Sequence, residues 1–95
     1  DHHHADEVFT SIGKETVKVF NKDELENILN QLSDEKYGFV LRAKGIIKAE
    51  EGKWIHFDFV PEEYEVRYGS ADYTGRLCVI GKDLNEELIW DLFGV

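Results

Sequence analysis

The stretch from Gly38 to Gly45 limits the folds open to this chain more than any other part of the sequence. Its side chains alternate between two faces, as they do in an extended strand. One face would carry Phe39, Leu41 and Ala43, and the other would carry Val40, Arg42 and Lys44. The pattern predicts a central strand with one covered face. Glycine adopts positive φ or a bulge at little steric cost, so the end glycines are expected to open the strand and to bend it.

Two segments have the apolar spacing of amphipathic helices. The first, about residues 22–32, follows Asn21, which can form a capping box with Glu24. Its apolar stripe consists of Leu25, Ile28, Leu29 and Leu32. The second follows Asn85, and its stripe consists of Leu88, Ile89, Leu92 and Phe93. Each stripe requires an apolar surface to cover it.

Four further runs predict strands. Residues 8–20 are rich in β-branched and aromatic side chains and are interrupted at Gly13-Lys14. Residues 54–60 alternate most clearly: the core set is Ile55, Phe57 and Phe59, and the opposite set is Trp54, His56 and Asp58. Residues 64–68 and 76–80 alternate in the same way, and the loop around Gly52 predicts an antiparallel hairpin. The sum is an α+β domain of order β-α-β-β-β-β-α, a mostly antiparallel sheet of four or five strands with two helices on one face.

Composition excludes several classes of protein. The chain has 95 residues, enough for one hydrophobic core, and a net charge of −9 that would repel phosphate backbones and anionic lipid. Nucleic acid and membranes are therefore not expected as partners. No apolar run approaches the roughly 20 residues that cross a bilayer. The single cysteine, Cys78, cannot form an internal disulfide, which fits a cytoplasmic protein.

Two sets of residues could bind a metal ion. Residues 1–7 are polar and are expected to be a flexible linker or the remnant of a tag. They contain His2, His3 and His4, whose imidazoles could bind zinc, cobalt or nickel weakly, although an inert segment is an equally good interpretation. On the sheet, His56, Asp58 and Cys78 form a second candidate set, which requires the three side chains to converge on one ion. No other cofactor is expected.

The uncovered face of the predicted sheet is the best candidate for function. It would carry cations and a tryptophan on an otherwise acidic protein, which is typical of a contact surface. The residues that we expect to bind a partner are Arg42, Lys44, Trp54, His56, Arg67 and Arg76. Ordinary cross-strand pairing of Arg42 with Asp58 or Glu65 is the alternative explanation for its charge.

Two motifs follow one another along the chain. The first is Leu41-Arg42-Ala43-Lys44-Gly45 with Trp54 in the next strand, and the second is Arg76-Leu77-Cys78-Val79-Ile80-Gly81 before a terminal helix. Together they resemble the C-terminal domain of CobW-type GTPases, a family of cobalamin-synthesis and metal-chaperone proteins. The histidine run is also similar to the His-rich linker between the two domains of those proteins. The resemblance covers nearly the whole chain, with residues 8–95 as the domain.

The resemblance implies a binding domain rather than an enzyme. In that family the nucleotide-binding loop and a Cys-x-Cys-Cys metal motif lie in an N-terminal GTPase domain, and this sequence has neither. The implied partners are the GTPase domain of the same protein and a client that receives cobalt or zinc. The alternative hypothesis is a free-standing ligand-binding domain or small enzyme, with a pocket on the open sheet around Trp54 and Tyr68.

Overall fold

The structure, a computed structural model, describes residues 8–95 and arranges them as a sheet with two α-helices. The elements are β1 (Thr10–Thr16), β2 (Val19–Phe20), α1 (Lys22–Gln31), η2 (Glu35–Tyr37), β3 (Phe39–Ala49), η3 (Glu50–Gly52), β4 (Trp54–Val60), β5 (Glu63–Gly69), β6 (Gly75–Lys82) and α2 (Glu86–Phe93). The predicted order is confirmed, with β2 as a short additional strand. Among the described residues, no helix has the length and apolarity that crossing a membrane requires.

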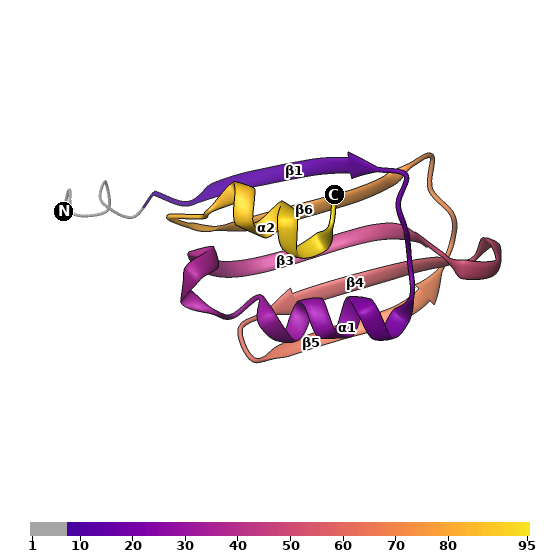
Figure 1. The fold of residues 1–95 in the computed structure, drawn as a ribbon, viewed down its shortest axis with the longest axis horizontal. Helices are drawn as coiled ribbons and strands as arrows, with labels where there is room; N and C mark the ends of the chain where they lie inside the picture. Colours follow the sequence, from indigo (N-terminus) through magenta and orange to yellow (C-terminus); the bar gives the residue numbers. More distant parts are fainter. Residues whose placement is uncertain (1–7) are drawn as a thin grey trace.

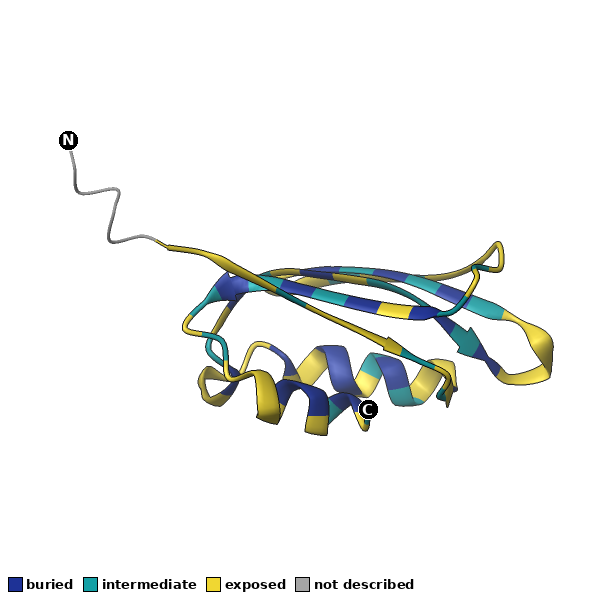
Figure 2. Ribbon diagram, turned by 90° about the horizontal axis from the view of Figure 1, so that it is seen from above, coloured by how far each residue is buried: buried dark blue, intermediate teal, exposed yellow. Residues whose placement is uncertain are grey.

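The sheet has the order β1-β6-β3-β4-β5, and every neighbouring pair along it is antiparallel (Figure 1). The short strand β2 pairs with β3 in parallel. Seen from the side, both helices lie against the same face of the sheet (Figure 2). The predicted α+β architecture, with helices on one face only, is therefore confirmed.

The core lies between the helices and this covered face. Strand β4 contributes Ile55, Phe57 and Phe59, each at most 2% exposed, as its alternation predicts. The stripe of α1 is equally well buried, from Leu25 at 0% to Ile28 at 4% exposed. A helix of ten residues is only marginally stable alone in water, so this tertiary burial is what stabilises it.

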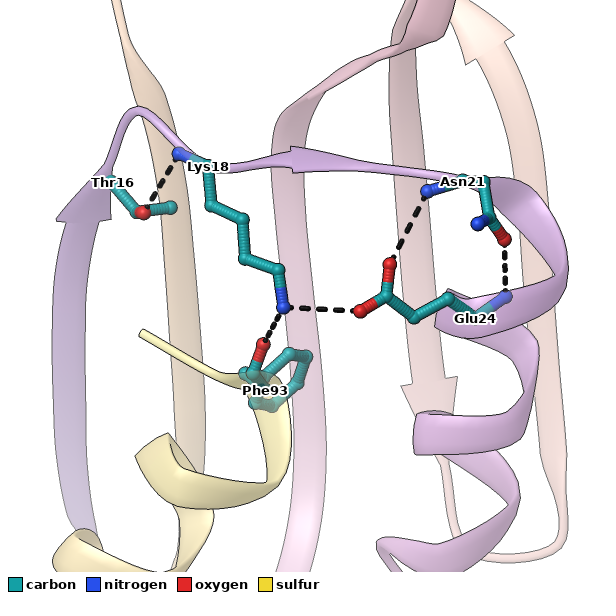
Figure 3. Close-up of polar contacts among 5 residues, drawn as sticks. All are labelled: Thr16, Lys18, Asn21, Glu24 and Phe93. Atoms are coloured by element: carbon teal, nitrogen blue, oxygen red, sulfur yellow. Dashed lines mark hydrogen bonds and ion pairs between the residues drawn. The ribbon is translucent and has the colours of Figure 1, made fainter.

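Lys18 links the two helices (Figure 3). Its ammonium group donates to Glu24 Oε2 at 3.0 Å, in the first turn of α1, and to the carbonyl oxygen of Phe93 at 2.8 Å, at the last residue of α2. A cation is favourable beside the last carbonyls of a helix because of the helix dipole. Glu24 also completes the predicted capping box: its Oε1 accepts from the Asn21 amide at 3.5 Å, while Asn21 Oδ1 accepts from the Glu24 amide at 2.7 Å. One side chain thus joins the start of α1 to the end of α2.

The buried stripe predicted for α2 is partly wrong. Leu88 is 37% exposed, whereas Trp90 is only 7% exposed and packs in the core. The helix therefore turns Ile89, Trp90 and Phe93 towards the sheet. Burial of the indole is tolerated because Trp90 Nε1 donates to Glu86 Oε2 at 3.2 Å, one turn earlier. The predicted N-cap is correct, since Asn85 Oδ1 accepts from the Leu88 amide.

The prediction for the first residues of β3 is wrong because the strand contains a bulge. The register with β6 shifts between Val40 and Arg42, so one extra residue, Leu41, lies on the β3 side. An extra residue reverses which side chains face the core. Val40 is therefore buried at 4% exposure, while Phe39 is 56% exposed. The bulge lies here rather than at Gly45, where the pairing is continuous.

The interruption predicted at Gly13 is also wrong. The register between β1 and β6 runs without a shift from Thr10 to Thr16. The chain leaves the edge of the sheet after Thr16, whose hydroxyl accepts from the Lys18 amide at 3.0 Å. This turn carries the chain across to β2 and the start of α1.

The bulge predicts a reversal of mutational sensitivity at two neighbouring residues. We expect Val40→Ala to lower the free energy of unfolding by about 1.5 kcal/mol or more, because it removes two buried methyl groups. Phe39→Ala, although it removes more atoms, should cost less, because its ring is more than half exposed. Urea unfolding followed by circular dichroism measures both values. A larger loss for Phe39→Ala would contradict the register with a bulge at Leu41.

Candidate docking surface on the open face of the sheet

The face of the sheet opposite the helices, here called the open face, carries all six residues predicted to bind a partner. Its members alternate along their strands with residues that face the helices, and lie opposite one another on neighbouring strands. They are Arg42, Lys44, Ile46 and Lys48 of β3, Trp54, His56 and Asp58 of β4, Glu65 and Arg67 of β5, and Arg76, Cys78 and Ile80 of β6. The alternation thus gives the face its composition.

Most cations on the open face make weak ion pairs. Arg42 Nη2 lies 2.9 Å from Asp58 Oδ1, and the two side chains are 54% and 38% exposed. This is the cross-strand pairing that the sequence left as the alternative for Arg42. Arg67 and Arg76 pair more loosely, at 3.5 Å from Glu65 and 3.6 Å from Asp72. Exposed pairs of this kind contribute about 0–1 kcal/mol each.

Lys44 is placed differently from these arginines. In the strand register Lys44 lies opposite Asp58 of β4 on one side and opposite Cys78 of β6 on the other, so it is at the centre of the open face. It has no ion-pair partner among the other described residues. Its charge is therefore available to a partner, whereas that of Arg42 is already engaged by Asp58.

A hollow of about 410 Å³ lies on the open face beside Lys44. Its lining includes Lys44, Ile46, His56, Arg67, Asp72 and Arg76. The loop between β5 and β6 reaches this site, since His56 Nε2 lies 2.8 Å from the carbonyl oxygen of Ser70. The carbonyl can only accept, so the proton is on Nε2. A β-carbon at Gly69 would lie 2.7 Å from the His56 ring, which explains the glycine there.

The pocket expected around Trp54 and Tyr68 does not exist in this form, because the two rings lie on opposite faces. Tyr68 pairs with Ile55, a core residue, and so points to the helix side of the sheet. There Tyr68 lies near the ammonium groups of Lys22 and Lys53, with distances to its ring centroid of 6.0 and 5.2 Å. Trp54 pairs with Gly69 on the open face.

The family of this chain follows from a match to a protein-family model. The model of the cobalamin synthesis protein cobW C-terminal domain matches residues 9–94. The chain belongs to this family. The CobW resemblance inferred from the motifs in β3 and β6 is thereby confirmed. None of the curated proteins gives a significant match.

Solved structures show the same fold for this CobW C-terminal domain. The crystal structure of the Zn(II)-bound YjiA GTPase from E. coli is 24% identical, with a TM-score of 0.72, and the match covers 90% of this chain and 28% of that one. A Zn(II)-bound triple mutant of YjiA GTPase gives a TM-score of 0.74 with the same identity and coverage. The chain therefore spans little more than a quarter of the GTPases it resembles.

The structure does not support a metal site on the sheet of this CobW domain. Within residues 8–95, no three histidine, cysteine or acidic side chains gather closely enough to hold an ion. Cys78 and Asp58 lie opposite Lys44 on the two strands that flank β3, so their backbones are two strand spacings apart, roughly 10 Å. The second candidate set, with His56, is therefore wrong. His2, His3 and His4 lie outside the described residues, and their metal binding stays a prediction.

Part of the docking surface is not among the residues predicted from the sequence. Ile46 and Lys48 lie on the open face and follow from extending the alternation of β3 beyond Gly45. Asp72 lines the hollow from a loop, and Ser70 of the same loop contacts His56; no periodic signal in the sequence could place them there. The binding role of the six predicted residues stays a prediction, although they share one face.

Proposed function

We propose that this CobW C-terminal domain is a non-catalytic accessory module of a GTPase, and that its open face docks on the GTPase domain of the same protein. One observation carries the proposal: the helices cover one face of the sheet, while the opposite face presents accessible cations around a central lysine. The chain matches only 28% of the length of the GTPases it resembles, which fits a module of a larger protein.

The composition of the open face supports an interface between proteins. Trp54, Ile46 and Ile80 are partly buried and provide apolar area between the charged side chains. Near the start of β3, Phe39 and Val60 add exposed apolar area, at 56% and 42% exposure. Interfaces are enriched in aromatic residues and arginine, and this face has both. The charged side chains of the two helices are acidic except for Lys22, so the cationic character distinguishes the open face from the helix side.

The biological setting of the parent protein is part of the same proposal. The family is named after a cobalamin synthesis protein, and the crystal structure of the GTPase with the same fold contains bound Zn(II). We infer a cytoplasmic GTPase that handles zinc or cobalt, or that serves cobalamin synthesis. A client protein that receives the metal would be the second partner of the accessory domain.

Binding in trans tests the docking proposal. The GTPase domain from the same reading frame would be titrated with this chain in an isothermal calorimeter. Lys44→Glu reverses the unpaired charge at the centre of the open face, and we expect it to weaken binding at least tenfold, about 1.4 kcal/mol, because like charges placed at a complementary interface repel.

Lys22→Glu is the matched control, because it makes the same change of charge at the start of α1, on the helix side. Both variants shift the net charge of −9 equally, so long-range repulsion is the same in both. Equal affinities of the two variants, with both folded by circular dichroism, would refute docking through the open face. A larger loss in Lys22→Glu would place the interface on the helices.

A further inference from the structure

The hollow on the open face has more positive than negative charge available to a ligand. Its lining contains Lys44, Arg67 and Arg76 as cations, and Asp58 and Asp72 as anions. Asp58 is already engaged by Arg42 at 2.9 Å, from outside the lining. Arg67 and Arg76 make only loose, exposed pairs, with Glu65 at 3.5 Å and with Asp72 at 3.6 Å, which a bound carboxylate could replace at little cost. Lys44 has no ion-pair partner among the other described residues, in a protein whose net charge is −9.

The cations are arranged on opposite sides of a partly apolar floor. Across the sheet, Arg76 pairs with Ile46, Ile46 with His56, and His56 with Arg67. The two arginines thus stand three strand spacings apart, roughly 14 Å between their backbones, and both line the same hollow. A planar anion above Ile46 would meet a guanidinium on each side. Guanidinium groups match the fork geometry of carboxylates.

We propose that this hollow binds glutamate or aspartate side chains of an acidic segment in the docking partner. Arg67 and Arg76 pair with the carboxylate from two sides, and Lys44 adds a third charge at the rim. Ile46 packs against the aliphatic part of the bound side chain. The inference deepens the proposed function and rests on it for the identity of the partner.

The shape of the surroundings favours a peptide over a free oxyanion. Phosphate sites are commonly built from backbone N–H groups that point into a loop or from the N-terminus of a helix. Here the floor is the side-chain layer of paired strands, and no helix formed by residues 8–95 begins at the hollow. Partly buried Trp54 and exposed Phe39 lie on the same face and provide area for the rest of a segment. The overall negative charge opposes nucleic acid.

A titration of the isotopically labelled chain tests the hollow without the GTPase domain. The probe is the acetylated, amidated peptide Glu-Ser-Glu-Ser-Glu, and its control is the same peptide with glutamine for glutamate. We expect saturable changes in the amide shifts of Ile46, His56 and Arg67 with the acidic peptide only. Replacing both arginines (Arg67→Gln with Arg76→Gln) should weaken binding at least tenfold. Lys44→Gln should also weaken it, whereas Lys22→Gln on α1 should not.

Several outcomes would overturn the proposal. They are no saturable shift at millimolar peptide, equal binding of the glutamine peptide, or equal losses in Lys44→Gln and Lys22→Gln. Inorganic phosphate that saturates the same amides at matched ionic strength and more tightly than the peptide would show a site for a free oxyanion instead. Docking of the GTPase domain with no peptide binding would keep the proposed function and remove only this inference.

Discussion

Gly38→Ala is expected to lower the free energy of unfolding by about 3 kcal/mol or more, because two independent costs add. Gly38 joins η2 to β3 with φ 93° and ψ −170°. Backbone of this kind is almost confined to glycine, and a side chain there costs about 1–3 kcal/mol. The second cost is steric, since an added β-carbon would overlap the backbone of Asp83 and lie 2.8 Å from the Cα of Leu84.

The neighbouring backbone at Gly38 cannot move away easily. The amide of Asn85 donates to the carbonyl oxygen of Tyr37 at 3.1 Å, which ties the loop before α2 to η2. Tyr37 is itself only 4% exposed. A methyl group at Gly38 would therefore separate the start of β3 from the start of α2, and the caps of both η2 and α2 would be disturbed.

Gly52→Ala is the matched control for this prediction. Gly52 also has a positive φ, of 74°, but an added β-carbon there would meet nothing within 4 Å. Gly52→Ala should therefore lower the free energy of unfolding only by the conformational cost of the positive φ, about 1 kcal/mol. Urea unfolding of the three proteins measures the difference. Equal losses at the two glycines would show that the contact between Gly38 and the Asp83 backbone does not contribute.

The parts of the fold that the sequence predicts correctly are those set by local patterns. The alternation in β4 is regular because each residue from Trp54 to Phe59 has one partner on each neighbouring strand, with no bulge. The capping box at Asn21 and the N-cap at Asn85 depend on residues three positions apart, which the sequence shows directly. The two helices share one face because both need the same apolar surface.

The errors arise where tertiary packing decides between local alternatives. Nothing in the residues around Leu41 marks a bulge, so the faces of Phe39 and Val40 were assigned the wrong way round. In α2, the consecutive apolar residues Leu88, Ile89 and Trp90 span about 200° around the helix axis, so they cannot all face the core. Contact with the sheet selects Ile89 and Trp90, and Leu88 remains partly exposed.

In the docking surface, too, local patterns predict some features and the tertiary arrangement decides the others. Lys44, Arg67 and Arg76 were placed on one face because alternation fixes the side of a strand, and the register then brings them around one hollow. The distances between side chains on different strands depend on the order β6-β3-β4-β5, which the sequence does not specify. The wrong metal set with Cys78 comes from this missing order. The pocket with Tyr68 is wrong for another reason: Tyr68 follows Arg67 on β5, so alternation puts its ring on the opposite face.

The contact between Phe57 and Phe93 should carry much of the coupling between the sheet and α2. Their rings stack with centroids 6.2 Å apart and an angle of 24° between planes. Both side chains are at most 2% exposed. Phe57→Ala and Phe93→Ala should each lower the free energy of unfolding by about 3–5 kcal/mol, from lost burial and the cavity that remains.

Because the two rings touch, the losses should not add. We expect a coupling free energy of about 0.5–1.5 kcal/mol between Phe57 and Phe93 in a double-mutant cycle measured by urea unfolding. Phe59 is the matched control: it is equally buried on β4, but no ring stacking joins it to Phe93 among the described residues. If alanine unfolds the double variant, leucine at both positions keeps the cycle measurable. If the coupling free energy between Phe59 and Phe93 were as large as that between Phe57 and Phe93, burial in the core in general, rather than this ring contact, would hold α2 on the sheet.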